Sequence, residues 1–590
     1  MNKDPIFPRI SRVLENPWII LVTFILIFVL AGVLRTLPYL LNDFYFNVGF
    51  DTGTYQSVLN DYLTYPLTQK PGFPPVGIPN GDMRIWADPG FFMIAAMTST
   101  FSSMTVHEMF RWFLPLLVGI LFVLMIFTLS RRFLGVAAGL LLALLVSVSY
   151  VQVDTVNEAY YKQLIGSFLL ILSLLMFDRF QITRRRTFLY MFALFSAGIL
   201  FYHRPTFFLL GVIILILLIY FGLAKNKESL KALATSILVI AVITSIIWIP
   251  NLDVYVSMLI GALETSLWRF TTLPTGEGLW EGGGSILELF RGFDHVILGY
   301  LISIIYLIPF VILGAAYAKR TSRCSIILLS TLVLLAYVSL WLVFGNRFIV
   351  SLDLMMLLIA VIGVVYLVVR TDLKRNFKVV VCLLLVILIV VYTANVIIYQ
   401  SKKQPYIVEN MEGIQWIETN IDSEVSLIFA PDYLSADIIQ LGYRMAIWDS
   451  SLGAVGYETN LRAEEFMLYS PSNQSFNYQF FANNPQTMYM NIYVLWGTWD
   501  LDRPMIIIQE NIPCSEYFES ENYELVYSGY DEILSIFRYV GDRGTGEMPL
   551  DQDKENDADP WDTYLWDRTP PIERNSINNL SILLDSRMVI

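Results

Sequence analysis

Three carboxylates that could do chemistry stand beside long apolar segments of the chain: Asp51, Asp88 and Glu158. Asp51 follows the first apolar segment, and Asp88 lies where the same loop turns back toward the second. One carboxylate can take the proton of an attacking hydroxyl, and two can hold a divalent cation such as Mg²⁺ or Mn²⁺. The alternative for both aspartates is structural, because an aspartate before a helix caps its free N–H groups. For Glu158, the alternatives are a third catalytic carboxylate, a substrate hydrogen bond or a solvated turn.

Basic side chains occur in two short turns between apolar segments. Arg347 lies in one of them, and His203 and Arg204 lie in the other. A guanidinium matches the oxygens of a phosphate with two parallel hydrogen bonds, so these turns predict a phosphate-binding site. The alternative is an arginine that reaches up to the phosphates of bulk lipid. We interpret Arg35, near the end of the first apolar segment, as an arginine of that second kind.

The composition indicates what positions these residues. Of the 590 residues, 56% are hydrophobic and only 15% are charged, which is too apolar for a soluble domain. Apolar runs of about 20 residues each match the thickness of a bilayer, so the chain is predicted to be a polytopic α-helical membrane protein with about eleven spans. The predicted spans are 18–41, 109–130, 134–152, 160–178, 187–202, 206–224, 232–250, 296–317, 325–344, 348–369 and 378–399.

The loops between the predicted spans alternate in charge. One set is rich in arginine and lysine, and the other set is mostly acidic or aromatic. Basic loops stay in the cytoplasm, so the pattern predicts a multi-pass protein of the cell membrane with a cytoplasmic N-terminus and an extracytoplasmic C-terminus. The first span follows Lys3, Arg9 and Arg12 and is too long for a signal-peptide core, which favours a permanent signal-anchor. The short link 154–158 is then expected on the outer side.

The region after residue 400 differs in character from the rest. It carries 31 acidic and 11 basic residues, a net charge of −20, which argues against nucleic acid as a partner. Its pattern predicts an extracytoplasmic α/β domain over 401–540 and a loose acidic tail over 541–590. Helices are expected at 413–420 and 435–441, and strands at 425–429, 493–496 and 505–508.

Cysteine and histidine exclude two further classes of protein. Three cysteines occur in the chain, and Cys514 is the only one in the C-terminal third, so no disulfide framework can form there. The three histidines lie far apart in sequence, without the spacing of a zinc site.

The order of these residues resembles that of the GT-C glycosyltransferases, polytopic enzymes that use polyprenyl-phosphate-linked sugars. The segment 84–89 (RIWADP) is similar to the second acidic motif of the protein-mannosyltransferase and aminoarabinose-transferase branch. The resemblance covers most of the chain and implies that residues 1–400 form a GT-C-like catalytic domain. It also implies that Asp51, as the acid of the first loop, is the catalytic or metal-binding residue. Arg347, with His203 or Arg204, would then hold the phosphate of the carrier.

A second branch is also echoed in the chain. Segments 156–159, 346–353, 430–433 and 444–450 resemble parts of the oligosaccharyltransferase catalytic subunit. That subunit carries a Trp-Trp-Asp-Tyr-Gly signature that reads the acceptor sequon, whereas this chain holds only the fragments Asp432-Tyr433 and Trp448-Asp449. The sparse cysteines would suit an archaeal cell envelope.

The expected function is transfer of a sugar from a polyprenyl-phosphate carrier, such as a dolichyl phosphate, to a protein or glycan acceptor outside the membrane. Two alternatives stay open. One is oligosaccharyltransferase-like transfer of a lipid-linked glycan to asparagine. The other is a transporter or flippase of lipid-linked sugars, or a non-enzymatic scaffold; a transporter should place its polar residues near the bilayer midplane in broken helices.

The predicted orientation can be tested directly with labels on the two sides of the membrane. A tag at Lys227 should be protected from a membrane-impermeant reagent in intact cells, and a tag at Ser472 should react, because the basic loops stay inside. Labelling of both positions from the same side would contradict this topology.

Overall fold

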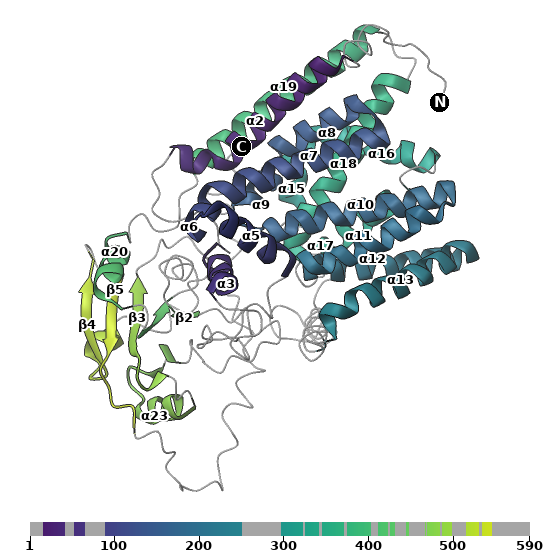
Figure 1. Cartoon of the computed structure of the whole chain (residues 1–590). Helices are drawn as coiled ribbons and strands as arrows, with labels where there is room; N and C mark the ends of the chain where they lie inside the picture. The colour runs from purple at the N-terminus through teal and green to yellow at the C-terminus, as the bar shows by residue number, and fades with distance from the viewer. Residues whose placement is uncertain are drawn as a thin grey trace, which may run out of the picture. The chain divides into compact units, whose positions relative to one another are not determined.

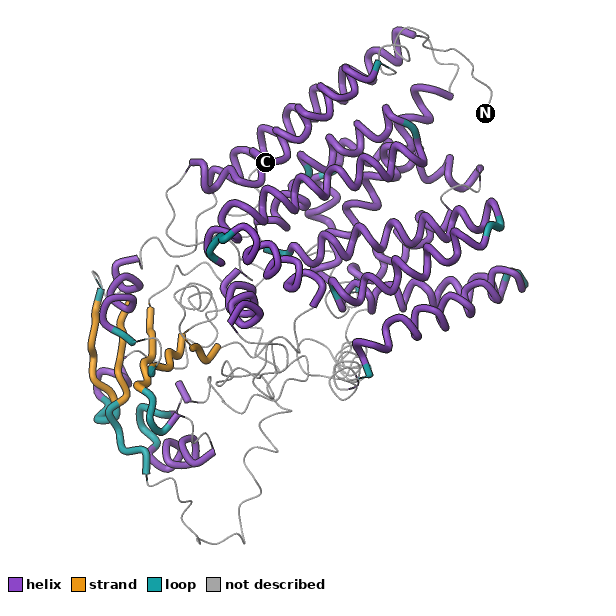
Figure 2. Tube along the Cα trace, viewed as in Figure 1, coloured by secondary structure: helices purple, strands orange, loops and turns teal. Residues whose placement is uncertain are grey.

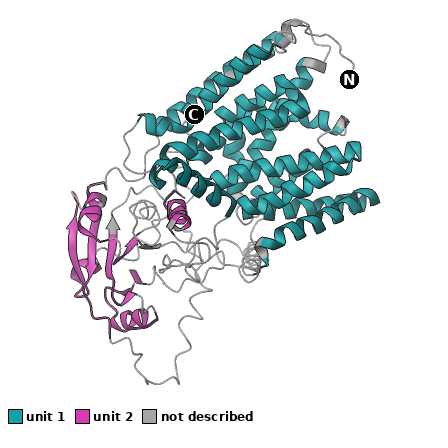
Figure 3. Ribbon diagram, viewed as in Figure 1, with its two compact units in different colours: residues 1–51, 87–255, 289–403 teal, residues 52–86, 256–288, 404–590 magenta. Residues whose placement is uncertain are grey.

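The computed structural model describes seventeen stretches of the chain. They are residues 16–41, 52–64, 89–157, 159–249, 256, 297–321, 325–340, 345–370, 375–402, 411–422, 425–430, 444–447, 466–467, 469–483, 487–497, 515–529 and 534–544. The chain divides into two compact units (Figure 3). The first contains 1–51, 87–255 and 289–403, and the second contains 52–86, 256–288 and 404–590.

The first unit is a bundle of apolar helices (Figure 1). Within the described residues, seven helices are long and apolar enough to cross a membrane, a bent pair would add an eighth span, and three apolar helices are shorter. Together they coincide with the predicted spans, which confirms the polytopic helical fold. The seven long helices include α2 (Pro17–Leu41), α7 (Leu114–Leu134), α10 (Tyr161–Thr183), α12 (Arg204–Leu223), α13 (Lys227–Trp248), α18 (Ile349–Val365) and α19 (Arg375–Lys402). The three shorter ones include α11 (Arg186–Tyr202), α16 (Ile308–Thr321) and α17 (Ser325–Ser339).

Short helices complete the bundle. They are α5 (Pro89–Ser102), α6 (Val106–Glu108), η2 (Met109–Phe113), α8 (Val136–Val148), α9 (Tyr150–Asn157), α15 (Leu298–Ser303), η5 (Ile305–Leu307), η6 (Gly345–Phe348) and η7 (Tyr366–Arg370). Helix α18 is the centre of the bundle, because every residue from Val350 to Val364 is buried. It packs against α8, α10, α16 and α17.

One predicted span is broken. Helices α8 and α9 meet at Ser149 with a bend of 54°, and α9 occupies most of the stretch 154–158 that we expected to be a short outward link. The stretch is therefore helical over 154–157, and its Thr155 and Asn157 are buried in the bundle, while its position on the outer side stays a prediction. The chain remains helical there because burial away from water obliges the backbone to satisfy its own N–H and C=O groups.

Arg35 lies at this break, inside the bundle. Its side chain is fully buried (0% exposed), and its guanidinium donates to the carbonyl oxygens of Val146 and Ser147, at 3.3 and 3.2 Å. Gly119 leaves room for it, because a methyl group there would overlap the arginine stem. The prediction of a lipid-facing arginine is therefore wrong. The broken end of α8 exposes carbonyls inside the protein, and a buried cation with several donors satisfies them.

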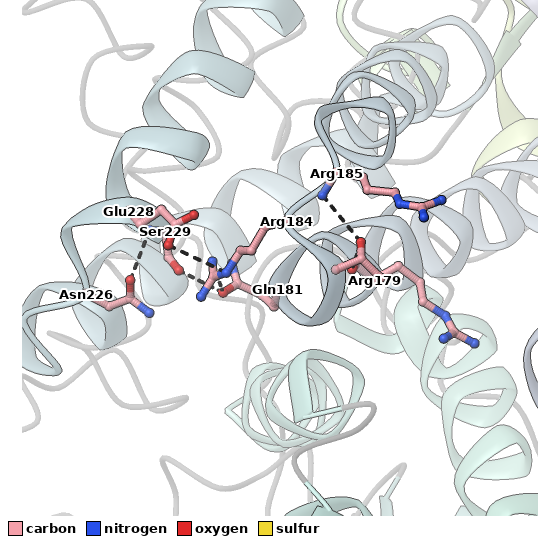
Figure 4. A network of polar contacts seen from close by, with 8 residues as sticks. Arg179, Gln181, Arg184, Arg185, Asn226, Glu228 and Ser229 are labelled. Carbon is pink, nitrogen blue, oxygen red and sulfur yellow. Dashed lines mark hydrogen bonds and ion pairs between the residues drawn. The ribbon is translucent and has the colours of Figure 1, made fainter. Parts of the chain in front are cut away.

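The arginine-rich turn after α10 is built by local contacts (Figure 4). Arg184 ends α10 in the left-handed conformation, with φ 56°, and pairs with Glu228 of α13 at 3.6 Å. Gln181 accepts hydrogen bonds from Arg184 and from Ser229, so the same turn joins α10 to α13. This end of α10 lies one helix length away from Tyr161, where the helix begins.

The second unit contains a five-stranded sheet (Figure 2). Its strands, in the order β2-β1-β3-β5-β4, are β2 (Arg444–Ile447), β1 (Ser426–Ala430), β3 (Asn491–Gly497), β5 (Leu534–Tyr539) and β4 (Tyr523–Ser528). β1 is parallel to β2 and β3, and β5 is antiparallel to β3 and β4. The described helices are α3 (Thr52–Thr64), α20 (Met411–Asn420), α23 (Gln474–Asn483) and α24 (Ser515–Glu519).

This arrangement confirms the α/β character expected for the C-terminal region. The predicted helix 413–420 and the strands 425–429 and 493–496 correspond to α20, β1 and β3. The expected helix 435–441, the strand 505–508 and all but the start of the tail lie outside the described residues. The core of the unit is aromatic, since the rings of Phe429, Phe466 and Phe480 pack together with their centroids within 6.3 Å of one another.

The end of α9 is a strained turn. Ala159 has φ 61°, its N–H donates to Val156, and the N–H of Tyr160 donates to Thr155. These bonds are those of a Schellman motif, whose left-handed position is usually glycine because a Cβ there costs roughly 1–2 kcal/mol. Ala159 is also buried, at 1% exposed. The packing around the turn therefore stabilises a conformation that alanine disfavours.

A substitution series at Ala159 can test this strain. We expect the free energy of unfolding of Ala159→Gly to lie within about 1 kcal/mol of that of the parent. Relief of the strain offsets the extra conformational freedom of glycine in the unfolded chain. Ala159→Val should lose about 2 kcal/mol or more, since a β-branched side chain fits neither the left-handed turn nor the packing. Thermal unfolding of the purified protein in detergent measures both. A valine variant as stable as the parent would show that the turn is not strained.

Candidate functional site: the α9–α10 junction

Helix α5, which begins directly after Asp88, packs against the start of α10. The ring of Phe91 stacks on Tyr161 with centroids 5.8 Å apart, and Lys162 Nζ lies 5.4 Å from the centre of the Phe92 ring. Gly90 allows the close approach, because a Cβ there would come within 2.9 Å of the carbonyl oxygen of Phe201. The first turn of α5 is thereby fixed between α10 and the end of α11.

Arg347, which is far from α10 in the sequence, also lies at this junction. It lies in η6, just before α18, and its guanidinium carbon is 5.6 Å from the centre of the Tyr160 ring. The side chain of Gln163 donates to the backbone carbonyl of Arg347. One turn further into the bundle, Ser167 and Ser351 share a 2.7 Å hydrogen bond between α10 and α18. Arg347 is half-buried, with its charge held against an aromatic face.

The turn between α11 and α12 contacts α10 as well. His203 links the two helices in an extended conformation and is 5% exposed, with Nδ1 2.7 Å from Thr206 Oγ1. Gly166 of α10 makes room for it, since a Cβ there would lie 2.9 Å from the Cβ of His203. Arg204 begins α12 and is half-buried. The imidazole is thus a buried link between helices, and Arg204 is the charged group of this turn.

Two of the three predicted acids adjoin these elements in sequence, since Asp88 directly precedes α5 and Glu158 directly follows α9. Asp51, Asp88 and Glu158 themselves lie outside the described residues. The described neighbours of Asp88 and Glu158 meet at the junction: Pro89 begins the α5 helix that packs on Tyr161 and Lys162, and residues 157 and 159 flank position 158. Helix α5, the α9–α10 turn, η6 and the α11–α12 turn are brought together, although 258 positions separate residue 89 from residue 347.

A divalent cation would need oxygen ligands of the kind that Asp51 and Asp88 provide. Among the described residues, no three His, Cys, Asp or Glu side chains gather into a metal site. Asp51 and Asp88, the ligands predicted from the sequence, lie outside the part of the chain that the structure describes.

Several contact residues of the junction escaped the sequence analysis. Tyr160, Tyr161 and Gln163 were not singled out there, and their partners lie 70 to 187 positions away. The available signal was the density of aromatic and polar residues over 160–163, directly before an apolar run. That signal cannot distinguish an interfacial anchor from a site, because tyrosine suits both.

Part of the first unit matches a known protein family. Residues 89–248, from α5 to α13, match the family described as dolichyl-phosphate-mannose-protein mannosyltransferase. A search of the curated protein sequences finds no significant match.

Solved structures are similar over most of the chain. The archaeal oligosaccharyltransferase AglB from Archaeoglobus fulgidus, in complex with an inhibitory peptide and a dolichol-phosphate, aligns with 82% of this chain and 70% of its own at 14% identity and a TM-score of 0.51. Its complex with Zn and sulfate aligns with 86% of this chain and 72% of its own, at 15% identity and a TM-score of 0.52.

A bacterial structure shares the same architecture. ArnT from Cupriavidus metallidurans, bound to undecaprenyl phosphate, aligns with 89% of this chain and 99% of its own, at 12% identity and a TM-score of 0.50. At such identities the likeness establishes the fold, and the short motifs of the sequence pointed to the same group of proteins. The chain is a polytopic helical membrane protein with the fold of the GT-C glycosyltransferases.

Proposed function

We propose that the chain is a membrane glycosyltransferase that moves a sugar from a polyprenyl-phosphate-linked donor to an acceptor outside the membrane. The observation that carries the proposal is the convergence at the α9–α10 junction, where a half-buried arginine lies over Tyr160 beside the helix that follows Asp88. The similar AglB and ArnT structures hold a dolichol-phosphate and an undecaprenyl phosphate, which supports a lipid-linked donor.

The proposed chemistry assigns one role to each charged group. The bond between the sugar and the carrier phosphate breaks, and the acceptor oxygen forms a new bond to the same sugar carbon. Arg347 stabilises the negative charge left on the phosphate, where its two parallel donors fit the oxygens. Asp51 takes the proton of the acceptor, or holds with Asp88 a divalent cation that neutralises the leaving phosphate.

Two kinds of transfer to an acceptor fit the proposal, transfer of a single sugar and transfer of a whole glycan to asparagine. A peptide in the AglB complex supports transfer to protein, and with it the alternative of oligosaccharyltransferase-like transfer to asparagine. The family match over 89–248 supports transfer of a single sugar, as the description of that family names a mannosyltransferase. We favour single-sugar transfer, because the sequon-reading signature is present only as fragments.

One feature of the structure is also expected of a transporter, namely a broken span with charged residues beside it. Arg35 and Asp353 are both fully buried at the α8–α9 break. Both, however, are hydrogen-bonded to the broken span itself, Arg35 through carbonyls and Asp353 through side chains. Polar groups that bind a transported cargo should line a cavity, whereas these support the helices around them.

The role of Asp51 can be tested with purified protein and dolichyl-phosphate mannose labelled in the sugar. Asp51→Asn should lower transfer by about 100-fold or more, because asparagine keeps the size and the capping ability of aspartate but not its basicity or charge. Its unfolding temperature should stay close to that of the parent. Glu228→Gln, at the opposite end of the bundle, is the control that should transfer normally.

A chelator then separates the two roles of Asp51. Loss of transfer in EDTA and recovery with Mg²⁺ or Mn²⁺ indicate a metal ligand, and transfer insensitive to EDTA indicates a general base. Normal transfer by Asp51→Asn would leave helix capping as the function of this residue.

Donor titration tests Arg347. We expect Arg347→Lys to raise the KM for dolichyl-phosphate mannose about 10-fold, since an ammonium group cannot form the paired hydrogen bonds of a guanidinium. Arg184→Lys is the matched control, because Arg184 pairs with Glu228 at the far end of α10. An unchanged donor dependence in both Arg347→Lys and Arg347→Ala would assign Arg347 to bulk lipid.

A further inference from the structure

The α8–α9 break is held by three other helices. Arg35 of α2 binds the last carbonyls of α8, and the hydroxyl of Tyr392 in α19 accepts the N–H of Tyr150 at 3.0 Å. A break inside a membrane protein leaves backbone groups without helical partners, each of which costs several kcal/mol if it stays unsatisfied. These contacts explain why the break is tolerated. They do not explain why α9 leaves at its particular angle.

Asp353 of α18 supplies that direction. One carboxylate oxygen, Oδ2, accepts from Ser149 Oγ at 2.8 Å and from Gln152 Nε2 at 2.9 Å. Ser149 is the residue at the break, and Gln152 is in the first turn of α9. The other oxygen, Oδ1, accepts from the hydroxyl of Tyr300 in α15 at 3.1 Å. The carboxylate is 0% exposed, and both of its oxygens are used in fixing helices.

The far end of α9 is where the candidate site begins. Helix α9, which leads from the break toward the strained turn at Ala159, has eight residues and is about 12 Å long at 1.5 Å per residue. A tilt of about 5° at the break would therefore move the turn by about 1 Å. A displacement of about 1 Å of a reacting group can cost a factor of about 100 in rate. The angle at the break thus decides whether Tyr160 lies beside Arg347.

We propose that Asp353 is a positioning residue, which holds α9 at its angle to α8 so that the α9–α10 junction meets Arg347. The inference rests on the proposed function for its kinetic consequence, but the structural consequence stands by itself. Asp353 acts through the position of its oxygens and takes no part in the transfer. Asparagine can place its single carbonyl oxygen where Oδ2 now accepts two hydrogen bonds, and leucine cannot.

The kinetic experiment compares substitutions at Asp353 in the full-length protein with dolichyl-phosphate mannose as donor. We expect Asp353→Leu to lower kcat at least ~10-fold while the donor KM changes less than ~3-fold, and Asp353→Asn to stay within ~3-fold of the parent in kcat. Gln152→Leu should lower kcat as well, and it should add little to Asp353→Leu in the double variant, because the hydrogen bond between the two side chains is already lost in the single variant.

The matched control is Asp178→Leu. Asp178 is also a buried aspartate of the bundle, and it accepts the N–H of Ile326 at the start of α17, away from the break. It should cost stability without the fall in kcat. Hydrogen–deuterium exchange gives the structural readout. The amides of 150–157 should exchange faster in Asp353→Leu than in the parent, and their exchange rates should be unchanged in Asp178→Leu and in Asp353→Asn.

Two results would overturn the proposal. Asp353→Asn as inactive as Asp353→Leu would show that the charge matters and not the acceptor position. Equal effects of Asp178→Leu on kcat and on exchange over 150–157 would show a general loss of packing. If Asp353→Leu does not fold, Gln152→Leu carries the same comparison. If the parent transfers no mannose, the proposed function fails, and the exchange experiment still decides the role of Asp353.

Discussion

The bundle depends on one constraint, that backbone polar groups removed from water must find partners within the protein. Unbroken helices meet it by themselves, but the chain breaks a helix at Ser149 in the middle of the first unit. Arg35 and Tyr392 bind backbone groups there, and Asp353 binds side chains of the same break, each from a different helix. A local defect in one span is therefore what ties α2, α18 and α19 to α8 and α9.

The same defect has a use at the other end of α9. An unbroken helix would carry the chain straight on from α8, whereas the bent one delivers a tight left-handed turn to the start of α10. Aromatic rings and small residues then complete the junction: Phe91 stacks on Tyr161, Gly90 lets α5 approach α11, and Tyr160 lies beneath Arg347. Asp353 at the break thereby supports the position of the turn that brings Tyr160 to Arg347.

Much of the architecture could be predicted from the sequence. Hydropathy located the spans because a bilayer imposes a length on any apolar helix, and the helices lie where the apolar runs are. The strands β1 and β3 were predicted because their residues are apolar over a short stretch between polar turns. Arg347 was singled out because it is a cation in a short turn between two apolar spans, and its turn does reach the junction.

The tertiary structure decided the partners of the buried charges and the course of the chain over 150–160. Arg35 reads as a lipid-facing residue in sequence, because nothing local reveals that α8 ends beside it with free carbonyls. Asp353 lies 204 positions from Ser149 and 53 from Tyr300, distances at which residue type gives no indication of contact. Hydrophobic pattern determines which segments enter the membrane, since that depends on each segment alone. Which polar groups meet inside depends on how all the helices pack, because a buried charge is stable only where other helices bring it a partner.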